Sequence, residues 1–255
     1  MLSTSSTQLP TSSAHVLEAR ELPDKLVGFD TLDHRARPFN LLRAQVARFA
    51  AAGARRIGVT SPAPEVGKTF VASNLAAALS RLPDFTTFLF DLDLRRGSVA
   101  EAFGLTPEQG VAEFLTGQVD DLAKISWQIE GQSLVIFPTR GSAVASSEIL
   151  ASRACADMFM RMGNDAQQSV CICDLPPAFA NDDAMIAAEM LDGYLLIVED
   201  GVTTIKQVED AIRFLGREKM LGTVLNRYVR GLGGEDYGYG YGPGVEKKYA
   251  KYYSR

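Results

Sequence analysis

The stretch TSPAPEVGKTFVASNLA, residues 60–76, places a Gly-Lys-Thr triplet between two kinds of predicted secondary structure. RRIGVT (55–60) before the triplet is a β-prone run, and FVASNLAAALSRL (70–82) after it has the composition of a helix. A strand, a turn-rich loop and a helix in this order are typical of a phosphate-binding loop, in which backbone amides at the helix N-terminus face the phosphates.

The loop departs from the strict pattern G-x-x-x-x-G-K-[ST], because Pro62 stands where the first glycine is expected. The remaining chemistry is intact: Gly67 lets the backbone approach the phosphates, and Lys68 and Thr69 can bind the β/γ-phosphates and Mg²⁺. The alternative is a chance Gly-Lys-Thr in a surface loop, which the strand–loop–helix context disfavours. Consecutive residues are therefore expected to contact ATP: Pro64, Glu65, Val66, Gly67, Lys68, Thr69 and Phe70.

Aspartates end two further predicted strands. TTFLFD (86–91) ends at Asp91, and SVCICD (169–174) ends at Asp174. Asp93 follows Asp91 by two positions, so both carboxylates face the same side of an extended chain. Because ligands of open parallel sheets bind at the carboxyl edge of the strands, we expect these carboxylates beside the phosphate-binding loop, in a magnesium–nucleotide site. The alternative for Asp91 or Asp174 is a helix cap or a turn residue.

The rest of the chain alternates strands and helices. Further predicted strands are SLVIFP (133–138), DGYLLIVED (192–200) and LGTVLN (221–226), and helices are predicted near 39–51, 111–125, 147–163 and 204–216. This order predicts an α/β fold of the P-loop NTPase (Rossmann-like) class, a mainly parallel sheet flanked by helices on both faces. The predicted domains are a disordered polar lead (1–24), an ATP-binding domain (25–228) and a flexible Gly/Tyr-rich tail (229–255).

The bulk composition excludes several other classes of protein. With 255 residues, 46% hydrophobic residues and a net charge of −5, the chain is an ordinary globular protein without a general attraction for nucleic acid or acidic membranes. It has no run of about eighteen apolar residues. Cys155, Cys171 and Cys173 lack the spacing of metal ligands, which indicates reduced cysteines in a cytosolic protein.

Together these motifs resemble those of the bacterial tyrosine kinases (BY-kinases) that accompany polysaccharide export, over most of residues 36–228. TSPAPEVGKTFVASNLA is similar to their Walker A segment, FLFDLDLRRG to their Walker A′ segment and CICDLPP to their Walker B segment. GVAEFLTGQ, SSEILAS and LGTVLNRY are similar to other family segments. The resemblance implies a P-loop protein of the deviant-Walker subclass, an ATP-dependent protein tyrosine kinase with ATP and Mg²⁺ as cofactors.

The resemblance also implies a role for each matching residue of the site. Lys68, a catalytic residue, and Thr69 would bind phosphate and Mg²⁺. Asp91 would act on Mg²⁺ and help to deprotonate the incoming tyrosine, while Asp93 would support that catalytic site. Asp174 would hold the water shell of the ion.

Most of the tyrosines are concentrated in the tail, where glycines are interleaved with them. Six of the eight lie after residue 236: Tyr237, Tyr239, Tyr241, Tyr249, Tyr252 and Tyr253. The resemblance implies that this cluster is autophosphorylated between subunits, and each phosphate would add about −1.5 to −2 charges. The alternative is a sticky low-complexity tail used for self-association.

Three further features bear on the comparison with BY-kinases. Asn226, at the end of the last predicted strand, would contact adenine, with an ordinary turn residue as the alternative. Glu65 brings a negative charge near the phosphates unless its side chain points outward. The family's ring-forming motif E-x-x-R-x-x-R aligns with Arg37, Asn40 and Arg43, so only the last arginine is kept.

Two other functions fit part of the pattern. One is an ATPase switch like the partition (ParA) and septum-site (MinD) proteins, which use a second lysine early in the loop, where this chain has Pro62-Ala63. The other is a catalytically weak ATP-binding adaptor of a membrane polysaccharide co-polymerase. For the kinase, the resemblance implies a cytoplasmic protein recruited to the inner membrane by a separate transmembrane co-polymerase that activates it. It also implies self-association for phosphorylation in trans, and a tyrosine phosphatase as a further partner.

Overall fold

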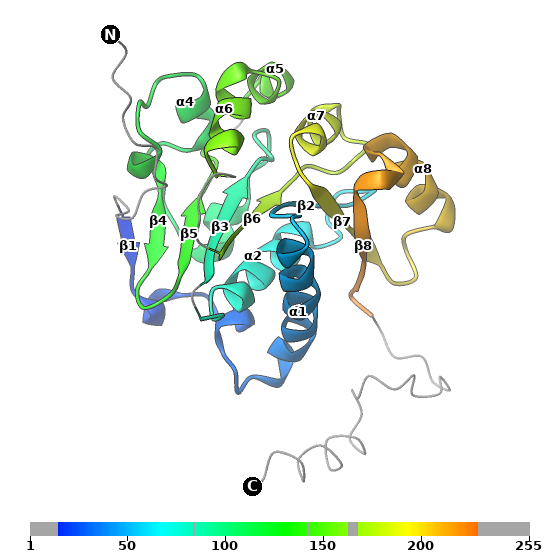
Figure 1. Ribbon diagram of the computed structural model, residues 1–255, viewed down its shortest axis with the longest axis horizontal. Helices are drawn as coiled ribbons and strands as arrows, with labels where there is room; N and C mark the ends of the chain where they lie inside the picture. The colour runs from blue at the N-terminus through cyan, green and yellow to red at the C-terminus, as the bar shows by residue number, and fades with distance from the viewer. Residues whose placement is uncertain (1–14, 84, 142, 163–167, 229–255) are drawn as a thin grey trace, which may run out of the picture.

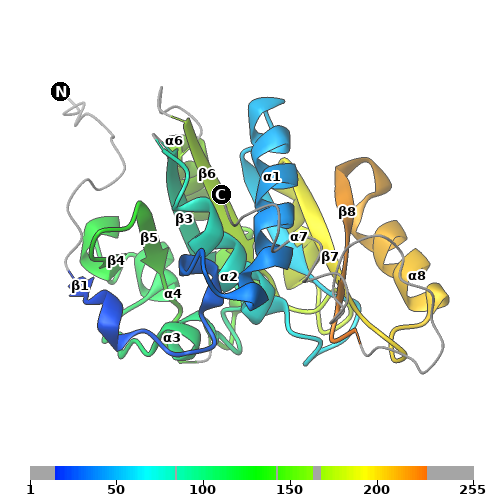
Figure 2. The same cartoon turned by 90° about the horizontal axis from the view of Figure 1, so that it is seen from below.

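The computed structural model describes residues 15–83, 85–141, 143–162 and 168–228. Within these ranges the chain forms one eight-stranded sheet in the order β1-β4-β5-β3-β6-β2-β7-β8, with helices on both faces (Figures 1 and 2). Strands β4 and β5 pair antiparallel, and the other neighbouring strands pair parallel. The predicted α/β fold with a mainly parallel sheet is therefore confirmed.

The longest strand pair lies at the centre of the sheet. The strands are β1 (His15–Leu17), β2 (Arg56–Thr60), β3 (Phe85–Asp91), β4 (Trp127–Ile129), β5 (Leu134–Phe137), β6 (Gln168–Asp174), β7 (Gly193–Glu199) and β8 (Met220–Asn226). Strands β3 and β6 pair over their whole lengths, from Phe85 opposite Gln168 to Asp91 opposite Asp174. Because both faces of these strands are covered by helices, their sequences are largely apolar.

The helices form one layer on each face of the sheet. They are α1 (Arg37–Ala51), α2 (Lys68–Leu79), α3 (Val99–Phe103), α4 (Val111–Leu115), α5 (Ser146–Leu150), α6 (Arg153–Met162), α7 (Asp183–Glu189) and α8 (Ile205–Leu215), with short 3₁₀ helices at Ala19–Glu21, Val27–Phe29, His34–Ala36, Leu122–Ile125 and Arg217–Lys219. Helices α1 and α2 pack on the sheet face that carries Leu89, whereas α6, α7 and α8 pack on the opposite face (Figure 2).

Helix α2 fixes the start of the candidate site in space. Nine of its twelve residues are buried, because it lies between the sheet, α1 and α3. This burial explains its sequence, which is rich in alanine and has no charged residue after Lys68. A helix so enclosed is rigid, so Lys68 and Thr69 in its first turn are held in fixed positions relative to the strands.

The disorder predicted for residues 1–24 does not extend to the part of this segment that the structure describes, from residue 15 onward. His15–Leu17 form an edge strand parallel to β4, and the imidazole of His15 stacks on the Trp127 ring at a centroid distance of 4.5 Å. A strand of three residues is too short to show periodicity in the sequence, so the prediction of disorder rested on the polar composition of this segment alone. Residues 1–14 and the predicted tail of residues 229–255, including its tyrosines, lie outside the described residues.

Two predicted helices are divided in the structure. The helix expected over 111–125 consists of α4 and a 3₁₀ turn, because Gly117 adopts a left-handed φ of 76° after α4. The helix expected over 147–163 is split into α5 and α6, since the Ser152 hydroxyl accepts a hydrogen bond from the Cys155 amide and so starts a new helix. Sequence analysis also missed α3, α7, β1 and β4, which have at most seven residues each.

The three cysteines lie in the interior of the protein. Cys155, Cys171 and Cys173 are buried free thiols, and burial raises the pKa of Cys155 to about 12. The sulfur atoms of Cys171 and Cys173 are 3.5 Å apart on β6. Over the described ranges, every helix is too short or too polar to cross a bilayer.

Candidate nucleotide site

The predicted site residues meet at the carboxyl edge of three adjacent strands. Strand β6 lies between β3 and β2 in the sheet. Asp91 at the end of β3 is the register partner of Asp174, and Val59 of β2 pairs with Asp174 from the other side. The loop that leaves β2 therefore begins beside Asp174, with Asp91 on the next strand at the same edge of the sheet, as the sequence analysis expected.

The loop between β2 and α2 depends on a glycine at its last position. Gly67 has a φ of 91°, in the left-handed region that favours glycine. The side-chain amide of Asn226 occupies the space that a Cβ at this position would need, and it donates a hydrogen bond of 2.7 Å to the carbonyl of Val66. Asn226 thus ties the end of β8 to the loop, which neither the adenine role nor the turn role had foreseen.

The other predicted loop residues occupy two different environments. Pro64 and Glu65 are exposed on the outer side of the loop, and Glu65 has a φ of 63° with 77% of its side chain exposed. Val66 is buried, whereas Phe70 is 39% exposed and packs edge-on against the Phe39 ring. The charge of Glu65 therefore points away from the loop interior.

A hydrogen-bonded chain links the first turn of α2 to the strands. Thr69 donates its hydroxyl proton to Asp174 Oδ2 at 2.5 Å, and the Ser98 hydroxyl lies 2.7 Å from Thr69 Oγ1. Burial raises the pKa of Asp174 to about 6, an effect that the charge of Lys68 and the Thr69 hydrogen bond oppose. The Lys68 ammonium therefore lies within electrostatic reach of Asp174.

Asp91 is a helix cap as well as a member of the acidic pair. Its Oδ2 accepts a hydrogen bond of 3.0 Å from the Val99 amide in the first turn of α3, and its Oδ1 accepts one of 3.3 Å from the Asp93 amide. Burial, together with the neighbouring charge of Asp174, raises the pKa of Asp91 well above its usual value. Asp91 therefore caps helix α3, as the alternative role supposed, and also lies beside Asp174 in the candidate site.

Asp93 stabilises its own loop while its charge still acts on the paired aspartates: besides burial, it contributes to the raised pKa of both Asp91 and Asp174. Its Oδ1 accepts a hydrogen bond of 3.0 Å from the Arg96 amide and so closes the turn after β3. The Arg96 side chain reaches across to Glu65 at 3.6 Å, but both side chains are more than three-quarters exposed. Such an exposed ion pair contributes little to stability.

Sequence analysis missed a polar cluster beside this turn. Arg95 donates to the Ser146 hydroxyl at 2.6 Å and to Asp183 Oδ2 at 3.2 Å. The buried carboxylate of Asp183 also accepts from the hydroxyls of Ser146 and Ser147 at the start of α5. Since Ser146 and Ser147 belong to the family-like segment SSEILAS, that resemblance was the signal available, but it gave no role.

The donor set fits a magnesium ion that is bound mainly through a nucleotide. Asp174 Oδ1 is buried and has no hydrogen-bond partner among the described residues, which leaves one hard oxygen of this carboxylate without a protein donor. Over the same residues, no three or more His, Cys, Asp or Glu side chains are grouped as metal ligands. Mg²⁺ characteristically keeps several waters and uses one or two carboxylates plus phosphates.

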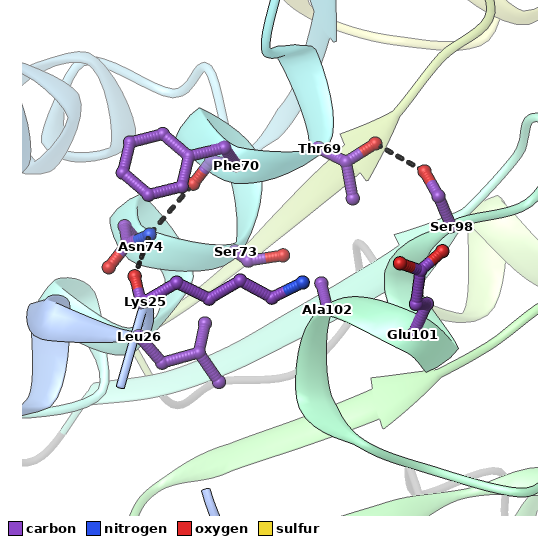
Figure 3. A pocket seen from close by; sticks show the side chains of 9 residues that line it. All are labelled: Lys25, Leu26, Thr69, Phe70, Ser73, Asn74, Ser98, Glu101 and Ala102. Atoms are coloured by element: carbon purple, nitrogen blue, oxygen red, sulfur yellow. Dashed lines mark hydrogen bonds between the residues drawn. The ribbon is translucent and has the colours of Figure 1, made fainter. Parts of the chain in front are cut away.

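A pocket of about 130 Å³ opens beside Thr69, between α2 and α3 (Figure 3). Lys25, in the turn before the 3₁₀ helix Val27–Phe29, and Glu101 of α3 line the pocket. The side chains of Ser73 and Ser98 face it from α2 and from the start of α3. The Ser73 hydroxyl is buried and lacks a hydrogen-bond partner in the described part of the chain. No sequence pattern had pointed to this pocket.

Residues 57–236 match the family described as the CobQ/CobB/MinD/ParA nucleotide binding domain. The chain belongs to this family. This membership, together with the mainly parallel sheet, confirms the predicted P-loop NTPase fold. A nucleotide-binding domain is therefore present over most of the described chain.

Within the CobQ/CobB/MinD/ParA family, the chain is similar to bacterial tyrosine kinases, which confirms the resemblance predicted from its motifs. It is 32% identical to the tyrosine-protein kinase ptk of Acinetobacter johnsonii over 71% of this chain and 24% of the relative. It is 31% identical to the succinoglycan biosynthesis transport protein ExoP of Rhizobium meliloti over 80% of this chain and 26% of the relative. The chain thus spans about a quarter of the length of these relatives.

A solved structure supports the same assignment. The kinase domain of the Escherichia coli tyrosine kinase ETK matches with a TM-score of 0.72 and 28% identity, over 86% of each chain. The similarity therefore extends well beyond the Walker segments.

Proposed function

We propose that this chain is the catalytic domain of an ATP-dependent protein tyrosine kinase. The observation that carries the proposal is the hydrogen bond between Thr69 and Asp174, with Asp91 as the register partner of Asp174. It joins the phosphate-binding loop to two acidic strand ends, as a magnesium-bound triphosphate requires. Relatives named tyrosine-protein kinases support the choice of reaction.

In this proposal the start of α2 binds the phosphates. The backbone amides of its first turn and the Lys68 ammonium hold the β/γ-phosphates, and Pro64, Glu65 and Val66 form the loop around them. A bound Mg²⁺ would neutralise the triphosphate, with Thr69, Asp91 and Asp174 as the residues that hold it or its waters. Asn226 supports the loop through Val66 and lies where β8 approaches the nucleotide.

In this proposal Asp91 and Asp93 act on the incoming tyrosine. The phenol oxygen attacks the γ-phosphorus, the bond from that phosphorus to the β–γ bridging oxygen breaks, and ADP leaves. Asp91 accepts the phenol proton, and Asp93 supports it by holding the turn after β3. Because burial and Asp174 raise the pKa of Asp91, its ionised form is a stronger proton acceptor than a surface aspartate.

We further propose that the acceptors are the tail tyrosines of a second copy of the chain: Tyr237, Tyr239, Tyr241, Tyr249, Tyr252 and Tyr253. Transfer between copies requires self-association. The relative named for succinoglycan transport supports a role in exopolysaccharide assembly. We propose in addition that a transmembrane co-polymerase recruits this cytoplasmic domain to the inner membrane and activates it. A tyrosine phosphatase would reverse the reaction.

A phosphotyrosine blot after incubation with Mg-ATP tests the proposal. We expect a signal in the wild type that is lost in Lys68→Ala and in a chain truncated after residue 228. The signal should be retained in Lys124→Ala, a control lysine that is exposed and pairs with Asp120. The family name also includes MinD and ParA, so ATP hydrolysis without phosphotyrosine would replace the kinase by an ATPase switch. Nucleotide binding with neither activity would indicate an ATP-binding adaptor.

A further inference from the structure

Ser98 precedes α3 in the N-cap position, but its hydroxyl does not cap that helix. A serine in this position ordinarily accepts a hydrogen bond from an amide of the first turn. Here the carboxylate of Asp91 accepts from the Val99 amide at 3.0 Å. The Ser98 hydroxyl is turned instead toward Thr69 Oγ1, 2.7 Å away (Figure 3).

The direction of the hydrogen bond between Ser98 and Thr69 follows from the third member of the chain. The Thr69 hydroxyl has one proton, and Asp174 Oδ2 accepts it at 2.5 Å. Ser98 must therefore donate to Thr69. A hydroxyl oxygen has two lone pairs, so Thr69 Oγ1 keeps one lone pair after these two hydrogen bonds.

The backbone of Ser98 is itself held in place. A Cβ at the preceding Gly97 would collide with the side chains of Thr139 and Asp91, so the chain passes close to both. Thr139 donates a hydrogen bond of 2.7 Å to the carbonyl of Asp91. The same buried aspartate thus positions the start of α3 and the serine that contacts Thr69.

We propose that Ser98 is a positioning residue for the metal ligand Thr69. Asp174 and Ser98 hold the Thr69 hydroxyl from two sides, so that its remaining lone pair keeps one fixed direction, the one offered to Mg²⁺. Ser98 thereby raises the affinity for magnesium-bound nucleotide and has no effect on metal-free nucleotide. This inference rests on the proposed nucleotide site and adds a residue that no Walker motif contains.

The test measures binding of a fluorescent ADP analogue with Mg²⁺ and with EDTA. Loss of one neutral hydrogen bond should weaken binding with Mg²⁺ by about threefold to tenfold in Ser98→Ala, with less than about a twofold change in EDTA. Ser98→Thr keeps the hydroxyl and should restore most of the affinity. Ser126→Ala is the matched control, since that buried hydroxyl donates to the Ala123 carbonyl away from the site.

Three results would overturn the inference: equal loss with Mg²⁺ and EDTA, no loss in Ser98→Ala, or a loss that Ser98→Thr does not reverse. These outcomes leave the proposed function standing if the wild type binds the analogue more tightly with Mg²⁺ than with EDTA. If the wild type shows no such preference, the nucleotide site and the role of Ser98 fail together.

Discussion

Helices α2 and α3 begin beside each other, but their N-termini are used differently. Helix α2 starts after Gly67 without a side-chain cap from any described residue, whereas Asp91 accepts a hydrogen bond from the first amide of α3. The hydrogen bond between Thr69 and Ser98 joins the two starts. An uncapped N-terminus can bind an anion, and a capped one cannot use the same amide again. The comparison separates a binding helix from a supporting helix.

The largest effect is expected from removing the only charge in the first turn of the binding helix. Lys68→Ala should weaken nucleotide binding by on the order of 10- to 100-fold, because it removes a charge-assisted contact to phosphate. The dissociation constant of Mg-ADP measured by calorimetry checks this, with Lys124→Ala as the control. An unchanged constant in Lys68→Ala would mean that α2 does not bind the phosphates.

The buried carboxyl group of Asp174 should make the stability of the ligand-free protein depend on pH. Because burial raises the pKa of Asp174 from 3.8 to about 6, the folded protein holds this proton more tightly than the unfolded chain. This contribution is complete below about pH 4 and is lost as the pH rises through about 6. At roughly 1.4 kcal/mol per pKa unit, the loss is on the order of 3 kcal/mol.

Urea denaturation at pH 4.5 and pH 7.5 measures this effect. The free energy of unfolding should fall between the two pH values by more in the wild type than in Asp174→Asn, which has no carboxylate to titrate at that position. Identical pH dependence in both proteins would show that Asp174 is ionised as easily as a surface aspartate.

A matched pair of glycines tests the geometry of the binding helix. Gly67 and Gly53 both have positive φ, but an added Cβ meets the Asn226 amide at Gly67 and open space at Gly53. Both alanine variants should lose roughly 1 kcal/mol of stability from backbone strain. Gly67→Ala should lose measurably more, because Asn226 must also move. Equal losses in chemical denaturation would argue against the contact between β8 and the loop.

The smallest effect is expected from the exposed ion pair between Glu65, in the loop before α2, and Arg96, in the turn before α3. Glu65→Gln breaks the ion pair with Arg96, and because both side chains are mostly exposed, nucleotide affinity should rise by less than about twofold. Glu209→Gln on the exposed surface of α8 is the control. A change of tenfold in the Glu65 variant would place its charge inside the phosphate site.

The sequence was sufficient for the central part of this comparison. Gly67, Lys68 and the strand-ending Asp91 and Asp174 sit at positions that a period of two and a strand–loop–helix order define, so their meeting at one sheet edge was predictable. The contacts that support these residues could not be predicted from the sequence. The contacts of Ser98, and of Asn226 with Val66, join segments far apart in sequence and have no local signal.

Asp93 shows a second limit of sequence reasoning. Its spacing from Asp91 predicts a shared face, and besides burial the charge of Asp93 does contribute to the raised pKa of Asp91 and Asp174. The spacing gives no sign that the strand ends at Asp91, or that the Asp93 carboxylate accepts a hydrogen bond from the Arg96 amide in the turn that follows. The edge strand β1 and the short helices α3 and α7 were missed for a related reason. Elements of three to seven residues are fixed by tertiary contacts and carry too few residues for periodicity.

A crystal structure with ADP and Mg²⁺ tests the central claim most directly. The account predicts the β-phosphate at the N-terminus of α2 beside Lys68, and the ion on Thr69 Oγ1 with Asp174 at its coordination shell. Phosphates bound at another edge of the sheet, or an ion distant from both Thr69 and Asp174, would contradict it.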